Sequence, residues 1–275
     1  MKQLKKSELI VNQNGSIYHL GLLPDQVYPL VITVGDPNRV DMVSTYFDAI
    51  DYTVINREFK SVGGRIGDQK FMVISTGIGT DNIDIVLNEL AILSQYDLVS
   101  RTAKEEVKSL KIIRLGTSGS VQENLPIDSI VYSKYAVAME SLFHYYVHSF
   151  DELTFLDRTM PVIPCSSILE SYFKYYPSSL TATSCGFYGP QFRSAQLDPK
   201  YTLSQFSKMT YKGDYVGNIE METAGIYGLS KLLGFEAISI NAILANRITG
   251  EYSSQPHQVI ASMIDKAIDT LCQSK

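Results

Sequence analysis

Residues 111–120 read KIIRLGTSGS, a run of apolar residues that contains an arginine and then passes into small residues. Lys111–Leu115 predicts a buried strand, and Gly116–Ser120 predicts a tight turn rich in hydrogen-bond donors. A guanidinium without a partner near the interior of a sheet costs on the order of several kcal/mol. Arg114 therefore requires either a bound anion, which suits the donors of the turn, or a carboxylate that pairs with it at the strand end. These residues alone leave both alternatives open.

A second apolar run, Leu30–Val34, also passes into a glycine turn and an arginine. Gly35 permits a close approach of the backbone, and Arg39 projects from the first turn of the helix that follows. Because ligands of open α/β sheets bind beyond the carboxyl ends of the strands, Arg39 and Arg114 are expected to reach one site. Arg57 is a third candidate. Two or three arginines around one pocket favour phosphate over a carboxylate as the ligand.

Strands and helices alternate along the chain, which predicts an α/β fold with three layers, α/β/α. The expected strands are Leu30–Val34, Tyr52–Asn56, Phe71–Ser75, Lys111–Leu115, Ser129–Tyr132, Leu180–Ser184 and Ala237–Leu244. The expected helices are Arg39–Phe47, Asn82–Tyr96, Ser167–Tyr175, Met221–Leu233 and His257–Leu271. Most of the strands are continuous apolar runs, so helices should cover both faces of the sheet. The charged segment 98–109 is expected to be an exposed loop or a short helix.

The composition is that of an ordinary globular protein, with 275 residues of which 45% are hydrophobic. There is no low-complexity linker or repeat, so a single domain over residues 1–275 is expected. The net charge of −5 argues against a nucleic-acid surface, and no apolar stretch approaches the length of a membrane span. The three cysteines lack metal-ligand spacing, which indicates reduced thiols and a cytoplasmic protein.

Two motifs of other enzyme classes are incomplete. GIGTDN, residues 77–82, follows a predicted strand but has Asn82 where a dinucleotide site needs a third glycine. His144 and His148 are four residues apart, but Tyr145 stands where a zinc-binding HExxH motif needs a glutamate. The sequence therefore predicts neither an organic cofactor nor a metal ligated by side chains.

Three further segments carry polar groups that packing does not require. His19 lies among apolar residues, Gln191 and Arg193 follow a predicted strand, and Glu220 and Glu222 stand at the start of an apolar helix. Each has a structural explanation, namely a core histidine, a solvated loop and acids that favour a helix N-terminus. Taken singly, these structural explanations are favoured.

Taken together, the segments resemble the nucleoside phosphorylase family, and its uridine phosphorylase branch in particular. The resemblance implies an α/β/α fold with a twisted mixed sheet, and dimers that usually assemble in threes into a hexamer. It runs from about residue 17 to the C-terminus through the motifs GDPNRV (35–40), NREF (56–59), STGIGTDN (75–82), IIRLGTSGS (112–120), FYGPQFR (187–193), IEMETAGIYG (219–228) and ANR (245–247).

The resemblance implies that inorganic phosphate is the co-substrate and that fixed guanidinium groups align it beneath the anomeric carbon, with no covalent nucleophile. Glu58 matches a position that helps to hold a monovalent cation at the dimer interface in some relatives. Asn82 replaces the serine that accompanies it, so a cation is left open. The residues implied for phosphate are Gly35, Arg39, Arg114 and Thr117, joined by Arg57 from the neighbouring subunit.

The resemblance also implies how the ribose is held. Glu222 and the backbone of Met221 would bind its hydroxyls beside Glu220, and His19 would reach the 5′-hydroxyl across the dimer.

The base would lie near Phe187 and be read by Gln191 and Arg193. Uracil presents a carbonyl–NH–carbonyl edge, to which an amide can both donate and accept while a guanidinium donates. Purine-cleaving relatives use an aspartate where this chain has Asn246, and an amide cannot act as a general acid. The residues thus favour a pyrimidine.

The implied activity is that of a pentosyltransferase, the reversible phosphorolysis of uridine to uracil and ribose 1-phosphate. The alternatives are a purine nucleoside phosphorylase or a nucleosidase of the same fold, and a non-catalytic protein that binds nucleosides. A nucleosidase uses water and a binding protein consumes nothing, so neither needs Arg39, Arg57 and Arg114 together.

Overall fold

The computed structural model describes residues 3–273 and divides into two compact units. The first unit contains the residues up to Gly77, with Asp81–Ile113 and Leu229–Glu236. The second contains Ile78–Thr80, Arg114–Gly228 and the residues from Ala237 onward. The prediction of one domain over residues 1–275 stays a prediction.

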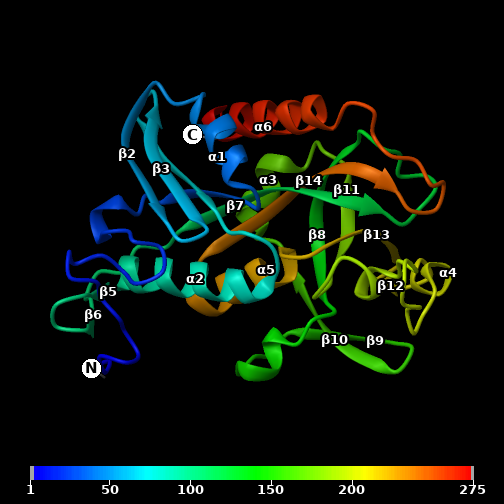
Figure 1. The fold of residues 1–275 in the computed structure, drawn as a ribbon, viewed down its shortest axis with the longest axis horizontal. Coiled ribbons are helices and arrows are strands. Elements are labelled where there is room, and N and C mark those ends of the chain that lie inside the picture. The colour runs from blue at the N-terminus through cyan, green and yellow to red at the C-terminus, as the bar shows by residue number, and fades with distance from the viewer. Residues whose placement is uncertain (1–2, 274–275) are drawn as a thin grey trace. The chain divides into compact units, whose positions relative to one another are not determined.

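The first unit is built on a mixed sheet with the strand order β7-β1-β4-β3-β2. β1 pairs in parallel with β4, whereas β3 runs antiparallel to both β4 and β2. Helix α1 contacts β1, β3 and β4. The elements are η1 Pro24–Gln26, β1 Leu30–Val34, α1 Pro37–Ser44, β2 Ala49–Asn56, β3 Phe59–Ile66, β4 Gln69–Ser75, α2 Thr80–Gln95 (from its second residue), β5 Tyr96–Asp97 and β6 Thr102–Ala103 (Figure 1).

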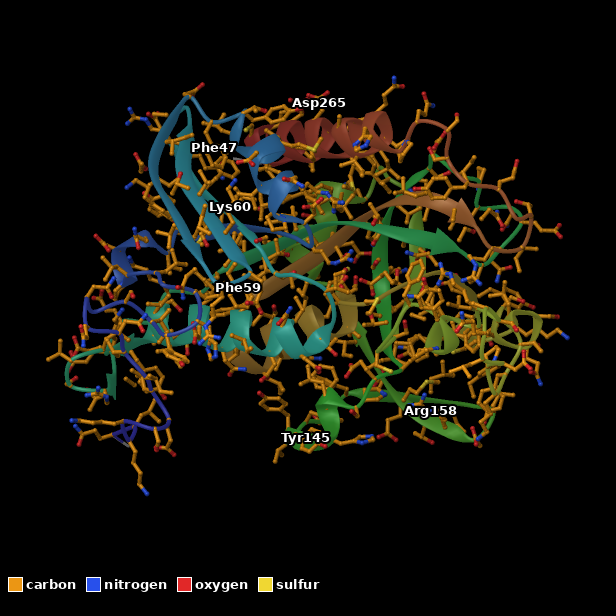
Figure 2. The ribbon with its side chains drawn as sticks, in the orientation of Figure 1. Phe47, Phe59, Lys60, Tyr145, Arg158 and Asp265 are labelled. Atoms are coloured by element: carbon orange, nitrogen blue, oxygen red, sulfur yellow. The ribbon has the colours of Figure 1, made fainter. Side chains whose placement is uncertain are left out.

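In the first unit, an aromatic residue that follows α1 packs on an aromatic residue of β4. Phe47 stacks on Phe71 with ring centroids 6.2 Å apart. Gly64 makes room for this pair, because a Cβ there would lie 2.5 Å from the Phe47 ring. Lys60 on β3 pairs with Asp41 on α1 at 2.5 Å, and Phe47 and Lys60 are both labelled in Figure 2.

The second unit has the strand order β12-β13-β11-β8-β14-β7, and the hairpin β9–β10 is attached through β8. Its sheet is also mixed, since β11 is parallel to β8 and β13 while β14 is antiparallel to β8. The elements are β7 Lys111–Ser120 (from Arg114), β8 Ile130–Ala138, η2 Leu142–Tyr145, β9 Asp151–Phe155, β10 Arg158–Pro164, α3 Ser167–Phe173, β11 Ser178–Thr183, η3 Gly189–Gln191, α4 Leu203–Phe206, β12 Thr210–Tyr211, β13 Asp214–Glu220, α5 Thr223–Leu233 (to Gly228), β14 Glu236–Asn246 (from Ala237) and α6 Pro256–Gln273.

One expected turn is wrong. β7 runs without a break from Lys111 to Ser120, so Gly116–Ser120 is strand and not a turn. The end of β7 pairs with β13, with Gly119 opposite Ile219. Small residues such as glycine and serine are typical of turns. In a strand they also occur where a long side chain must lie across the strand.

β3, β9, β10 and β13 were not expected from the sequence, nor were the two-residue strands β5 and β12. β3 and β13 mix polar residues and glycine with apolar ones, β9 is largely exposed, and proline interrupts the apolar run of β10. β6 lies within the segment 98–109, where a loop or a short helix was expected. Whether such a segment forms a strand depends more on pairing with a neighbouring strand than on its own composition.

Candidate functional site

Arg114 is buried on β7, with 6% of its surface exposed, and its guanidinium is bonded on two sides. Nη2 lies 2.9 Å from Oε2 of Glu220 and 2.6 Å from Oε2 of Glu222. Nη1 donates to Oδ1 of Asn241 at 2.8 Å and to Oγ of Ser239 at 3.3 Å. Of the two alternatives left open by the sequence, this structure contains the pairing with carboxylates. The role of Arg114 in phosphate binding stays a prediction.

Gly116 makes the space in which this guanidinium lies. A Cβ at position 116 would lie 1.8 Å from Nη1 of Arg114 and 2.2 Å from its Cζ, far inside any van der Waals contact. The glycine is therefore required by the arginine side chain and not by a turn. Thr117, the next residue on the strand, is half-buried.

In the cluster of Arg114, Glu220 and Glu222, one buried guanidinium faces two buried carboxylates. Burial lowers the pKa of Arg114, but the charges of Glu220 and Glu222 outweigh it and the net shift is upward. Burial raises the pKa of Glu222, and although Arg114 opposes this shift, the charge of Glu220 adds to it. Excess negative charge that is buried favours proton uptake at one carboxylate.

The two carboxylates differ in what holds them. Glu220 ends β13 and binds the start of α5, accepting from the backbone N–H of Glu222 and Thr223 and from the hydroxyl of Thr183 at 2.6 Å. Glu222 accepts from the N–H of Gly79 at 2.8 Å and from Arg114. Glu220 thus acts as the cap of the helix, which is one of the structural explanations open from the sequence. Met221 between them is half-buried.

Asn241 connects Arg114 to a buried polar network that the sequence did not reveal. Its amide donates to Oγ of Ser133 at 3.0 Å and to Oγ of Ser239 at 3.2 Å, while its oxygen accepts from Arg114. Ser133 continues the network to Thr181 at 2.6 Å. The available signal was the polar residues within the apolar strand AISINAIL, residues 237–244, since an amide and hydroxyls in a buried strand need partners.

Gln191 and Arg193 are brought together by the loop after β11. Nη1 of Arg193 donates to Oε1 of Gln191 at 2.7 Å, and Gln191 is 3% exposed. The guanidinium also stacks over Phe187, with Cζ 3.6 Å from the ring centroid. Arg247 donates to the backbone oxygen of Gln191 at 3.0 Å. Arg247 belongs to the motif ANR but was not singled out from the sequence.

Arg193 and Arg247 put two positive charges beside one amide. Burial lowers the pKa of Arg193 to about 10, and the charge of Arg247 adds to the shift. Burial also lowers the pKa of Arg247. Within the described part of the chain, neither guanidinium forms an ion pair, so both suit a ligand with carbonyl oxygens or developing negative charge.

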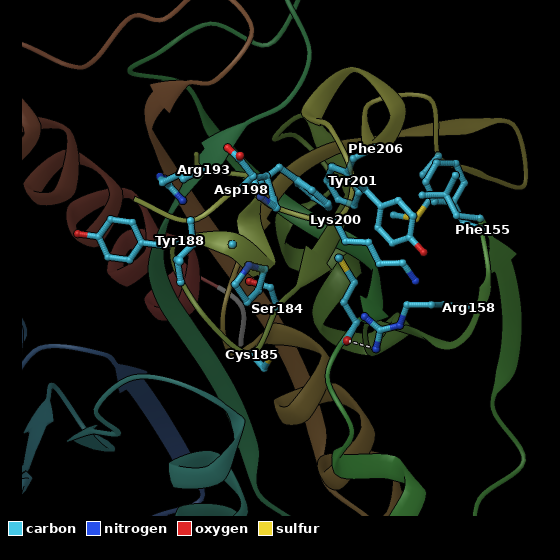
Figure 3. A pocket seen from close by; sticks show the side chains of 18 of the residues that line it. Phe155, Arg158, Ser184, Cys185, Tyr188, Arg193, Asp198, Lys200, Tyr201 and Phe206 are labelled. Carbon is cyan, nitrogen blue, oxygen red and sulfur yellow. Dashed lines mark hydrogen bonds between the residues drawn. The ribbon is translucent and has the colours of Figure 1, made fainter. Parts of the chain in front are cut away.

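A cavity of about 1110 Å³ adjoins this loop in the second unit. Arg193 and Tyr188 lie at one end of the view in Figure 3, whereas Phe155 and Arg158 lie at the other. Arg158 donates to the backbone oxygen of Met139 at 2.8 Å, the bond that is dashed there. The walls are largely apolar with a few charged groups, as in sites for small organic ligands.

His19 and Arg57 lie in the first unit and contact the same residue, Tyr18. The rings of Tyr18 and His19 meet edge to face with centroids 4.7 Å apart. Arg57 donates to the hydroxyl of Tyr18 at 3.1 Å, with its Cζ 5.1 Å from the ring centroid. These are the two residues that the resemblance assigns to the neighbouring subunit's site.

Gly35 and Arg39 flank the start of helix α1 in the first unit. Asp36 caps this helix by accepting from the N–H of Asn38 at 2.9 Å, and Pro37 occupies its first turn. Gly35 and Arg39 are both half-buried. Their roles in phosphate binding stay predictions.

Asn246 at the end of β14 is engaged on both sides of its amide. The nitrogen donates to the backbone oxygens of Gln122 and Leu125 at 3.0 and 3.1 Å. The oxygen accepts from the N–H of Ile248 and Thr249 at 2.9 and 3.0 Å. This residue holds two loops together.

Among residues 3–273, no three or more His, Cys, Asp and Glu side chains lie together so as to hold a metal ion. No helix there has the length and apolar character needed to cross a membrane.

Comparison with known proteins identifies the family. Residues 29–273 match the family described as the phosphorylase superfamily, and the chain belongs to it. This supports a pentosyltransferase that acts on a nucleoside and phosphate.

Individual relatives come from two branches. A uridine phosphorylase of Thermococcus kodakarensis is 26% identical over 95% of this chain and 88% of its own length. A purine nucleoside phosphorylase of Plasmodium falciparum is 29% identical over 59% of this chain and 65% of its own length. The solved structure of a Trypanosoma brucei nucleoside phosphorylase, described as showing uridine phosphorylase activity, covers 95% of this chain and 99% of its own with a TM-score of 0.82 and 26% identity. The expected α/β fold with a central mixed sheet is confirmed.

Proposed function

We propose that the protein is a uridine phosphorylase. The observation that carries this proposal is the buried amide of Gln191, flanked by Arg193 and Arg247. The amide can accept from the N3–H of uracil and donate to a carbonyl, and the guanidinium groups can donate to carbonyl oxygens. The bond between Arg193 and the Gln191 oxygen would give way to the base. Since the leaving base gains negative charge, these donors bind it more tightly in the transition state than in the substrate.

In this proposal Arg114 and Thr117 bind phosphate, together with Gly35 and Arg39, and Arg57 comes from the neighbouring subunit. Glu220 stays as the helix cap. Phosphate then replaces a carboxylate as the partner of Arg114, and Glu222 accepts hydrogen bonds from the ribose hydroxyls. Desolvated and aligned phosphate needs no covalent nucleophile on the protein.

A purine nucleoside phosphorylase is the second candidate, and the Plasmodium relative is the reason to consider it. Cleavage of a purine is assisted by a general acid at N7, and Asn246 stands at the matching position. The amide has no acidic proton at neutral pH, and both of its polar atoms are bonded to backbone. Uridine is therefore favoured over a purine nucleoside.

The test is to incubate the purified protein with uridine or inosine, with and without inorganic phosphate, and to measure the released base. Uracil released only with phosphate supports the proposal, whereas release of hypoxanthine instead supports the purine enzyme. Release without phosphate would indicate a nucleosidase. Uridine binding without turnover would indicate a binding protein.

A further inference from the structure

Glu89 on α2 is a buried carboxylate that the proposed function has not used. It is 8% exposed, and it lies against the segment that carries His19. The backbone N–H of His19 donates to both of its oxygens at 3.1 Å, and the N–H of Leu20 donates to Oε2 at 2.9 Å. Nδ1 of His19 lies 2.6 Å from Oε1. All of these residues belong to the first unit.

The rest of the segment is held as well. Asn56 donates to the backbone oxygens of Tyr18 and His19 at 3.2 and 2.7 Å. Gly21 has a φ of +67°, and a Cβ there would lie 3.0 Å from Cβ of Asn56, so the chain turns tightly against this residue. The histidine thus stands on a backbone that is anchored at both of its peptide groups.

The contact with Glu89 sets the tautomer of the ring. Oε1 of Glu89 is a carboxylate oxygen, which can only accept, so the ring must donate to it and Nδ1 carries the hydrogen. In the neutral ring, Nε2 on the opposite edge is then an acceptor. An acceptor recognises a hydroxyl hydrogen, which a 5′-deoxy or 5′-O-methyl sugar does not have.

We propose that Glu89 is a positioning residue that makes Nε2 of His19 a hydrogen-bond acceptor and so selects nucleosides with a free 5′-hydroxyl. This inference rests on the proposed function and on the role that the resemblance implies for His19, which is to reach the 5′-hydroxyl of the ribose across the dimer. Glu89 itself touches no substrate. It acts by fixing the direction and the tautomer of the ring, as carboxylates do for functional histidines elsewhere.

The test compares kcat/KM for uridine, 5′-deoxyuridine and 5′-O-methyluridine in the wild type and in Glu89→Gln. The amide of this variant has the size of the carboxylate. Its own N–H groups, however, would face the backbone N–H groups and the ring N–H that donate to Glu89 in the wild type. We expect kcat/KM for uridine to fall by up to roughly tenfold, the value of one hydrogen bond between neutral groups, while the two analogues change by less than about twofold. A general loosening of the fold would lower all three equally, and that result would overturn the proposal.

His19→Ala should remove the same preference, and the double variant should lose no more of it than His19→Ala alone, because the two residues act as a unit. Glu123→Gln, an exposed carboxylate of the second unit, is the matched control. If Glu89→Gln does not fold, His19→Ala and the ring measurement below carry the test.

The ring can be observed without catalysis. The ¹⁵N shifts of the His19 ring, assigned by loss of the signal in His19→Ala, should report hydrogen at Nδ1 in the wild type. Hydrogen at Nε2, with or without hydrogen at Nδ1, would overturn the proposal. If the protein does not cleave uridine, the proposed function fails. The dissociation constants of uridine and 5′-deoxyuridine then take the place of kcat/KM, and equal values would overturn the selection of the 5′-hydroxyl.

Discussion

At the scale of single residues, the site depends on how little space surrounds Arg114. Gly116→Ala would put a methyl group 1.8 Å from Nη1 of Arg114, so the guanidinium must leave its position between Glu220 and Glu222. We predict that this variant loses at least about 3 kcal/mol of stability, since two buried carboxylates lose their counter-ion. Thermal unfolding and kcat for uridine measure the two effects.

Gly119→Ala on the same strand is the control for this variant. Its added methyl would lie 3.4 Å from Cγ of Arg247, which is ordinary contact. A similar loss in both variants would mean that the strand needs glycine for its backbone and not for Arg114.

Gln191 gives the second prediction at this scale. Gln191→Ala removes the amide and leaves Arg193 without the acceptor that it has at 2.7 Å. We expect kcat/KM for uridine to fall, with a loss of about 1–3 kcal/mol in transition-state stabilisation, because a buried polar edge of the base loses its partner. Unchanged turnover of uridine would remove Gln191 from base recognition.

At the scale of elements, the end of β14 decides whether the site can be converted to purines. Asn246→Asp would supply the acid of the purine branch but would direct a carboxylate oxygen at the carbonyl oxygens of Gln122 and Leu125. We predict a loss of about 2–4 kcal/mol in stability and no gain of inosine phosphorolysis, because the residue holds loops and does not face an open site.

Chemical denaturation and an inosine assay test this prediction. Asn38→Asp in the first turn of α1 is the matched change, and an exposed acid there is expected to be neutral or slightly stabilising. Inosine cleavage by Asn246→Asp at wild-type stability would show that the amide has no structural role.

At the scale of the whole molecule, we predict a dimer with composite sites, in which Arg57 serves the neighbouring subunit. Arg114→Lys and Arg57→Ala should each be nearly inactive, and the lysine keeps a positive charge beside Glu220 and Glu222. In a heterodimer of the two variants one site carries both changes and the other carries neither. Random pairing of the co-expressed variants should therefore restore about a quarter of wild-type activity.

Size-exclusion chromatography with light scattering checks that the mixture assembles. Activity no higher than the mean of the two separate variants would place Arg57 in the site of its own subunit.

Local pattern was enough for elements that carry a continuous apolar run or an apolar stripe. The apolar stripe predicted helix His257–Leu271, and α6 spans Pro256–Gln273. β1 coincides with the expected strand, since five consecutive buried residues need no information from elsewhere. β3 and β13 were not predicted, because their residues form strands only through pairing with a neighbouring strand. The same kind of pairing makes Gly116–Ser120 part of a strand and not the expected turn.

The residue types of the site could be recognised in the chain before folding was considered: arginines beside glycines, an amide near a guanidinium, and two carboxylates before a helix. Their partners could not, because those depend on how the chain folds. Arg114 meets Glu222 across 108 residues, and His19 meets Glu89 across 70. No periodicity reaches so far, because the partner of a buried charge depends on which strands and helices become neighbours when the chain packs.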